Sequence, residues 1–452
     1  MRTTSLAETS GSDATGQVRY RLHDLIRIFA RERAETEETS RARRSTVRRA
    51  IQARVAAAEH LAVHFDENGF GLIHGDPPCA PPRRTPLDPP GVDPTAWLEA
   101  ELGALVAAVE QAAREGMPDL AWHLAGSLVD FFELRGHLTD WQRTHTAALQ
   151  ATTMAGDTVG TAVILQGLAF LEMARDHYEP ALAHLDRAAE LFGSADVLVG
   201  EVNCAAGAAV CHRLVGRLDQ AAACAHQADA LAEEAGYLLG QAHARYELGV
   251  VLREQGDLAG AADCLEQALA VARKGRYPRA EGIVLRGLGI LYARRGDGER
   301  SIKHYEQARA VLTAIGDELR AAYATHQLAD AHLDGGHAER AAPLLRRCID
   351  VFQAQEDQFG TALALCTEAK LHRQTGHPGP AANGLEAAAQ MWHRLGMPLW
   401  EARTLRDLGD LYAEIGATSA AASSWQRALK LVDRLHLPEA GEVSARLASA
   451  SS

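Results

Sequence analysis

Residues Leu248–Ala272 read LGVVLREQGDLAGAADCLEQALAVA, a helix-rich run that is interrupted at Gly256-Asp257 and then resumes. A glycine inside a helix costs about 1 kcal/mol relative to alanine, so one continuous helix is a poor interpretation. Glycine readily adopts the left-handed conformation that ends a helix, and the aspartate after it can accept the free amide hydrogens that begin the next helix. The dipeptide therefore predicts a hairpin between two antiparallel helices.

The same break recurs along the chain with a period of 40 residues. The first series consists of Gly136, Asp176, Gly216, Gly256, Gly296, Gly336, Gly376 and Gly416. A second series lies halfway between and consists of Gly116, Gly156, Asp196, Gly236, Arg276, Gly316, Glu356 and Gly396. Two breaks in each period indicate two helices per repeat. The sequence thus predicts about eight stacked helix pairs over residues 117–436, since a single pair cannot bury its own apolar face.

Residues at fixed distances from each hairpin glycine indicate how these helices pack. A leucine and a small residue precede the glycine, as in Leu288-Gly289. Alanine, a large residue and alanine follow it at helical spacing, as in Ala261, Leu265 and Ala268. This pattern resembles the tetratricopeptide repeat (TPR), and the resemblance implies an all-α solenoid that winds as a right-handed superhelix. A common TPR unit has about 34 residues, so a period of 40 would also suit a HEAT or armadillo array. The residue types at fixed distances from the hairpin glycine, here called columns, favour TPR.

Composition excludes several classes of function. The formal net charge of −13 argues against direct binding of nucleic acid, whose phosphates require a basic face. No run of about 18 apolar residues and no signal-peptide core is present, so we expect a cytoplasmic protein without membrane contact. Cysteines occur in an alanine-rich helical array, and the spacing of Cys204, Cys211 and Cys224 fits no zinc pattern. We therefore expect neither a disulfide framework, nor a metal, nor a cofactor.

The segment before the repeats has a different character. We expect a disordered tail over residues 1–17 and a helical segment over residues 18–74. The latter begins with a short strand at Val18–Leu22, and a second helix is expected from Ser45 to Asp66. Between them an amphipathic helix from His23 is predicted to turn four apolar residues inward, namely Leu25, Ile26, Ile28 and Phe29.

Two capping helices and a linker complete the predicted organisation. Proline at high density over residues 75–95 predicts an extended linker. Residues 96–116 are expected to form an N-terminal capping helix on the first repeat, with Trp97 and Leu98 on its apolar side. Residues 437–452 are expected to form a C-terminal capping helix and tail.

Four stretches of this chain resemble a specific class of regulator. YRLHDLIRIFARERA, LDPPGVD, WLEAELGALVAAV and LVDFFELRG are similar to the C-terminal half of AfsR-like members of the Streptomyces antibiotic regulatory protein (SARP) family. Those regulators join a winged-helix DNA-binding region to an NB-ARC ATPase of the STAND class and end in TPR repeats. The resemblance implies that residues 18–74 correspond to the end of the NB-ARC winged-helix module. It also implies that His23 approaches a nucleotide phosphate, but only where the rest of that module is present.

The sequence itself offers no nucleotide site. The chain contains no G-x-x-x-x-G-K-[ST] loop, so phosphates have no cradle. GLGILY at residues 287–292 lacks the third glycine of a dinucleotide loop, and its glycines occupy packing positions of the repeat. No nucleophile with a base, no paired carboxylates and no metal set is evident. We therefore expect no enzymatic activity and no catalytic residue.

The first helix of each pair is expected to line a concave groove, as in other solenoids of this kind. The candidate binding residues, chosen by their distance from the hairpin glycine, are Tyr246, Arg253, Arg286, Tyr323, His326, Asp330, Lys370, Arg373, Arg403, Arg406 and Asp410. Basic side chains recur among them although the protein is acidic. Our hypothesis is that this basic stripe recognises an acidic peptide, a protein segment or a chain carboxylate. The alternative is that these are ordinary solvated side chains on a long helical face.

The leading functional prediction is a TPR protein-interaction and sensor module of an AfsR-like transcriptional regulator. A protein, peptide or ligand in the groove would then control an ATPase and DNA-binding partner half. The alternative is a free-standing TPR receptor for a signalling peptide. A homo-oligomer, or association with the regulator half, is left open.

Overall fold

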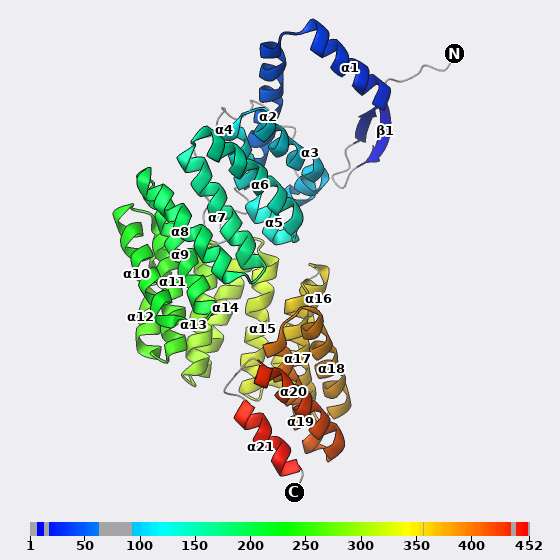
Figure 1. Cartoon of the computed structure of the whole chain (residues 1–452). Helices are drawn as coiled ribbons and strands as arrows, with labels where there is room; N and C mark the ends of the chain where they lie inside the picture. The colour runs from blue at the N-terminus through cyan, green and yellow to red at the C-terminus, as the bar shows by residue number, and fades with distance from the viewer. Residues whose placement is uncertain (1–6, 13–17, 63–92, 356, 435–439, 451–452) are drawn as a thin grey trace, which may run out of the picture. The chain divides into compact units, whose positions relative to one another are not determined.

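The computed structural model describes residues 7–12, 18–62, 93–355, 357–434 and 440–450, and these are almost entirely helical (Figure 1). The chain divides into two compact units, Met1–Gly275 (unit 1) and Arg276–Ser452 (unit 2). Each unit is described by itself. Within the described ranges, no helix combines the length and the apolar character needed to span a lipid bilayer.

Unit 1 begins with a two-stranded antiparallel sheet. Strand β1 (Ala7–Ser12) pairs with β2 (Val18–Leu22), with Ala7 opposite Leu22 and an irregularity between Thr9 and Gly11. The strand predicted at Val18–Leu22 is confirmed. The prediction of a disordered tail is wrong for Ala7–Ser12, because β2 offers its backbone groups to a partner strand. The rest of that predicted tail lies outside the described residues.

Helix α1 (Asp24–Glu37) forms where a helix was predicted, but it buries no residue. Leu25, Ile28 and Phe29 are 70%, 54% and 60% exposed, so their predicted inward orientation is wrong. The pattern correctly indicates an apolar face, but no described part of the chain covers that face. His23 caps the helix, where its Nδ1 accepts a hydrogen bond from the Leu25 amide at 3.3 Å.

Helices α2 (Ser40–Ala62) and α3 (Pro94–Arg114) connect this segment to the repeats. Helix α2 begins five residues before its predicted start, so the basic run belongs to its first turns. Residues 75–92 of the predicted proline-rich linker lie outside the described residues. Helix α3 occupies the region predicted for the capping helix and buries Trp97 and Leu98 in the same core as the first helix pairs.

The repeats in unit 1 form four helix pairs. The first helix of the first pair is broken at Leu128 into two shorter helices, whereas the other pairs have continuous helices. The bounds are α4 (Pro118–Ser127), α5 (Val129–Arg135), α6 (Leu138–Ala155), α7 (Thr158–Ala174), α8 (Tyr178–Ser194), α9 (Leu198–Leu214), α10 (Leu218–Glu234), α11 (Leu238–Gln255) and α12 (Leu258–Gly275).

The repeats in unit 2 form four more pairs and a final helix. The bounds are α13 (Pro278–Arg294), α14 (Gly298–Ala314), α15 (Glu318–Asp334), α16 (Ala338–Ala354), α17 (Gln358–Gln374), α18 (Pro378–Arg394), α19 (Pro398–Glu414), α20 (Thr418–Arg434) and α21 (Ala440–Ala450). Helix α21 lies in the range predicted for the C-terminal cap, and its Val443 is buried in the core cluster that contains Leu408 and Trp425.

Backbone conformation confirms the predicted hairpins. Every described member of the two series has a positive φ, including Gly256 at 91° and the non-glycine residues Asp176, Asp196 and Arg276 at 60°, 56° and 57°. Glu356 lies outside the described residues. The aspartate after the glycine acts as predicted at Asp257, whose Oδ1 accepts the Gly260 amide at 2.9 Å.

Glycines in the first helices confirm the predicted packing of large side chains against small ones. A Cβ added at Gly249 would lie 2.8 Å from Leu265 Cγ, and one at Gly289 would collide with the ring of Tyr305. The ring of Trp425 fills the equivalent space at Gly409. These close approaches bind the two helices of a pair together, and the predicted all-α array of helix pairs is confirmed.

Candidate ligand-binding surfaces

All of the predicted groove residues lie on the first helices of their pairs. Unit 1 contributes Tyr246 and Arg253 on α11. Unit 2 contributes Arg286 on α13, Tyr323, His326 and Asp330 on α15, Lys370 and Arg373 on α17, and Arg403, Arg406 and Asp410 on α19.

Lys370 joins two successive first helices of unit 2 through ion pairs. Its Nζ lies 2.7 Å from Asp330 Oδ1 and 2.6 Å from Asp334 Oδ1, both on α15. Partial burial alone would lower the pKa of Lys370, but hydrogen bonds and charge from Asp330 and Asp334 raise it above its ordinary value. The cation of Lys370 is therefore neutralised within the protein.

His326 and Tyr323 serve the packing of α15 against α17. His326 is 8% exposed, and its Nε2 lies 2.8 Å from Thr367 Oγ1. Burial lowers the pKa of His326, so the imidazole is neutral near pH 7. The Tyr323 hydroxyl donates to Asp357 Oδ2 at 2.7 Å, and burial together with this bond raises the pKa of Tyr323. Asp357 Oδ1 also accepts the Gly360 amide, so this carboxylate both caps α17 and holds the tyrosine.

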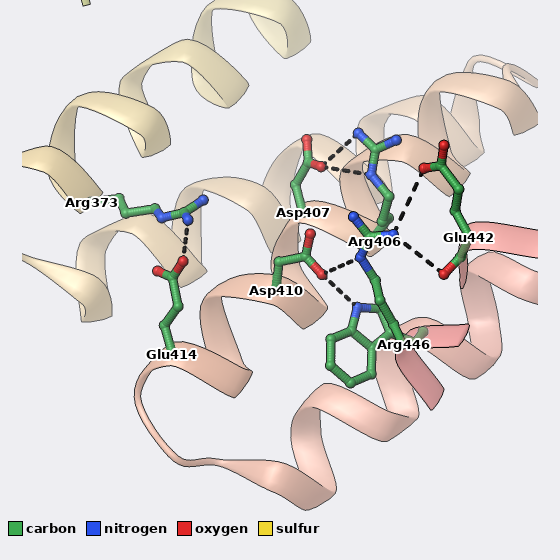
Figure 2. A network of polar contacts seen from close by, with 8 residues as sticks. Arg373, Arg406, Asp407, Asp410, Glu414, Glu442 and Arg446 are labelled. Carbon is green, nitrogen blue, oxygen red and sulfur yellow. Dashed lines mark hydrogen bonds and ion pairs between the residues drawn. The ribbon is translucent and has the colours of Figure 1, made fainter. Parts of the chain in front are cut away.

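A second charged network joins α19 to its neighbours, as Figure 2 shows. Arg406 Nη2 and Nε donate to Asp407 Oδ1 at 2.8 and 3.0 Å. Asp410 Oδ1 accepts hydrogen bonds from Trp425 Nε1 at 2.9 Å and from Arg446 Nε on α21 at 3.0 Å. The bond from Arg446 attaches the final helix, α21, to the first helix α19.

The remaining basic residues of the predicted stripe are also engaged. Arg373 forms an ion pair with Glu414. Arg253 and Arg403 each take part in a contact within the chain, and Arg286 interacts electrostatically with the Tyr323 phenol. Lys370, Arg373 and Arg406 of the stripe are therefore already paired with carboxylates. The stripe stays a prediction as a binding site for an acidic ligand, and at these three residues such a ligand would compete with the existing pairs.

Sequence analysis missed a pocket on the first helices of unit 1. It has a volume of about 240 Å³ and is lined by Asp130 and Glu133 on α5, Phe170, Met173 and Ala174 on α7, Tyr178 on α8 and Leu214 on α9. Leu214 is 47% exposed. Leu134, which follows Glu133 in the chain, is 45% exposed. The lining combines an apolar floor with two carboxylates and contains no basic residue.

Basic residues close to this pocket in sequence are committed to other acids. Arg213 Nε lies 3.1 Å from Glu247 Oε2 and also pairs with Glu254, both on α11. Arg175 Nη1 pairs with Glu172 Oε1 at 3.3 Å and also donates to Gln142 Oε1 at 2.8 Å. The Tyr178 hydroxyl donates to Asp176 Oδ1 at 2.5 Å, which fixes the ring at the pocket wall.

One column of residues in the sequence could have revealed this pocket. Two positions before the hairpin residue, the first three repeats have Leu134, Ala174 and Leu214. The other five have Glu254, Arg294, Asp334, Gln374 and Glu414. Apolar side chains at a position that is otherwise polar are a signal of a binding surface.

The described residues offer little support for a metal site or a reactive cysteine. No group of three or more histidine, cysteine, aspartate or glutamate side chains there could hold a metal ion. Burial raises the pKa of the Cys211 thiol to about 12, so this sulfur is protonated. The suggested role of His23 at a phosphate stays a prediction.

Comparison with known proteins identifies the repeat type. Residues 241–275 and 281–354 match the tetratricopeptide repeat family. The array is therefore a TPR-type solenoid, as predicted from the columns. A HEAT or armadillo assignment is not needed.

One curated relative is the regulatory protein AfsR of Streptomyces griseus, which is 29% identical over 153 residues. The match includes 34% of this chain and only 15% of that regulator. This similarity confirms the resemblance to AfsR-like regulators. The comparisons do not test the correspondence of residues 18–74 to the end of an NB-ARC module.

Two solved structures show the same fold. One is the STAND protein with a tetratricopeptide repeat sensor from Pyrococcus horikoshii (TM-score 0.59, 15% identity, 97% of this chain and 59% of that chain). The other is the Rap conjugation gene regulator of plasmid pLS20 in complex with a Phr peptide (TM-score 0.52, 11% identity, 74% of this chain and 96% of that chain). At these identities the likeness concerns the fold alone.

Proposed function

We propose that this chain is the protein-interaction and sensor module of an AfsR-like transcriptional regulator. A peptide or protein bound on the first-helix face would control an ATPase and DNA-binding partner half. The observation that carries this proposal is the similarity to the regulatory protein AfsR in a chain built from TPR helix pairs. Such a module acts in the cytoplasm, and its net charge of −13 leaves DNA contact to the partner half.

The exposed apolar face of α1 supports association with that half. Leu25, Ile28 and Phe29 project from this helix, and Tyr20 on the adjoining strand is 70% exposed. Contiguous exposed apolar groups on a soluble protein mark interaction surfaces. We propose that this face binds the regulator half. The first-helix face of the repeats would bind the peptide or protein that acts as the signal.

A free-standing peptide receptor is the second candidate. The Rap regulator with the same fold is in complex with a peptide, and unit 1 of this chain has an apolar pocket on its first helices. This function requires peptide binding but no partner half. Neither candidate includes catalysis, and we expect no turnover in a nucleotide hydrolysis assay.

The decisive experiment mixes the full chain with the ATPase and DNA-binding portion of the AfsR-like regulator from the same host. We expect a complex by size-exclusion chromatography with light scattering. The double variant Leu25→Ser/Phe29→Ser should lose it, whereas the control Met154→Ser, which changes an 89% exposed side chain, should retain it. Absence of a complex with the unaltered chain would overturn the sensor-module proposal and favour the free-standing receptor.

A further inference from the structure

We propose that the pocket on α5, α7 and α9 binds a basic peptide segment. One large apolar side chain of the peptide enters the pocket, while an adjacent lysine, arginine or terminal ammonium group lies against Asp130 and Glu133. This inference rests on the peptide-binding part of the proposed function, and it names the site and the chemistry of the ligand.

The size and lining of the pocket favour a side-chain anchor. Pockets for drug-sized molecules occupy about 300–1,000 Å³, whereas this one has about 240 Å³. Phe170, Met173 and Leu214 provide its apolar surface. Methionine adapts its shape to different apolar partners, which suits recognition of one aliphatic or aromatic side chain.

The two carboxylates of the pocket lining favour a cationic group next to the apolar side chain of the peptide. Asp130 and Glu133 are the charged residues of the lining. Both already take part in a contact within the chain, but a carboxylate has about four acceptor positions and can accept more than one donor. Arg213, which is adjacent to Leu214 in the chain, pairs with Glu247 and Glu254 on α11. Because the lining has two carboxylates and no basic residue, a basic peptide would gain charge-assisted hydrogen bonds here, whereas an acidic one would not.

The repeat pattern shows that these side chains are not required by the fold. Asp130 and Phe170 lie six positions before the hairpin residue, where unit 2 has Ile290, Asp330, Lys370 and Asp410. Glu133 and Met173 lie three positions before it, a column in which the other repeats have arginine, alanine or leucine. The same backbone positions accept ion pairs in unit 2. What distinguishes the first three repeats is the apolar side chain two positions before the hairpin residue, as at Leu214 in the pocket lining.

The test measures binding of a fluorescein-labelled peptide Gly-Lys-Phe-Lys-Gly to the full chain by fluorescence anisotropy. We expect saturable binding that weakens about tenfold or more with Gly-Glu-Phe-Glu-Gly and with Gly-Lys-Ser-Lys-Gly. Glu133→Lys should weaken binding of the lysine peptide and strengthen binding of the glutamate peptide. Leu214→Ser should weaken both phenylalanine peptides, whereas Met154→Ser, outside the pocket, should change neither.

Equal affinity for the lysine and glutamate peptides would overturn the proposal, as would binding that Leu214→Ser and Glu133→Lys leave unchanged. Absence of any binding would also overturn it. Circular dichroism of each variant verifies that the helices remain folded. Because the complex with the regulator half is measured separately and depends on Leu25 and Phe29, failure of the peptide test leaves that result standing.

Discussion

The first helices of the two units have the same backbone pattern but different chemistry at the same positions. Six and two positions before the hairpin residue, most repeats of unit 2 have charged side chains, and Lys370 pairs there with Asp330 and Asp334. In unit 1 the first repeats place Phe170 and Leu214 at these positions, where they line a pocket. The repeat therefore leaves these columns free to vary, so one scaffold can carry a rigid charged lattice and an apolar binding site.

Other columns do not vary in this way. Gly249 in unit 1 lies against Leu265, and Gly289 in unit 2 lies against Tyr305. A side chain at either glycine would separate the two helices of its pair. The contrast between fixed packing columns and variable surface columns can be tested by substitution in each class.

The largest effect is expected where a packing glycine is filled. Gly409→Leu would collide with Trp425, and overpacking of this kind costs about 3 kcal/mol of unfolding free energy. Gly379→Leu is the matched control, because nothing lies within 4 Å of a Cβ at that position. Urea unfolding measures both variants. Equal stability of the two would refute the role assigned to the packing glycines.

A titratable residue in a packing column gives unit 1 a dependence on pH. His145 occupies the column of Leu265 and Tyr305, is fully buried, and desolvation lowers its pKa from 6.5 to about 3. The folded state keeps this imidazole neutral. Its contribution to the free energy of unfolding is therefore fully present above pH 6.5 and is lost as the pH falls toward 3. Between pH 6.5 and pH 5 we expect a loss of between about 1 and 2 kcal/mol.

His145→Leu should remove this part of the pH dependence, whereas substitution of the exposed His226 by glutamine should leave it intact. Thermal unfolding of unaltered and substituted chains at pH 7 and pH 5 provides the comparison. A difference between the two pH values that survives His145→Leu would assign the effect to other groups.

Removing the ion pairs of Lys370 in unit 2 should lower the free energy of unfolding less than either change in packing. Lys370→Met leaves Asp330 and Asp334 without their shared cation and should cost about 1 kcal/mol, since the group is partly exposed. Addition of salt should reduce the difference between variant and unaltered chain. A cost that is independent of ionic strength would indicate lost packing of the lysine stem instead.

The smallest effect is expected at a hairpin that lacks glycine. Asp196 has a φ of 56°, a conformation that costs a residue with a Cβ about 1 kcal/mol. Asp196→Gly should therefore raise the unfolding free energy by up to about 1 kcal/mol, as measured by urea denaturation. Asp196→Ala, which keeps a Cβ, should give no such increase.

The helices and turns were predictable because their signals are local. Gly256 and its equivalents favour the left-handed conformation that ends a helix. The large side chain of Leu265 needs a small residue, Gly249, on the helix that it packs against. Burial of α1 was mispredicted, because the pattern of Leu25 and Phe29 shows which face is apolar but not whether anything covers it.

The surfaces were harder to predict because they depend on contacts between repeats. Lys370 and Asp330 are one period apart, so their pairing becomes visible only when repeats are aligned in columns. Read along the chain, Lys370 and Arg373 indicate a basic stripe. The pocket was missed for the same reason, since Phe170 and Leu214 belong to different helices.

The ion pairs that span one period in unit 2 have a mechanical consequence. Lys370 links the first helices α17 and α15, and Arg446 links the final helix α21 to the first helix α19. These ion pairs lie between helices one repeat apart, in addition to the apolar packing and the neutral hydrogen bonds of the array. Because dissolved salt screens partly exposed ion pairs, we expect a higher ionic strength to weaken these links between neighbouring repeats.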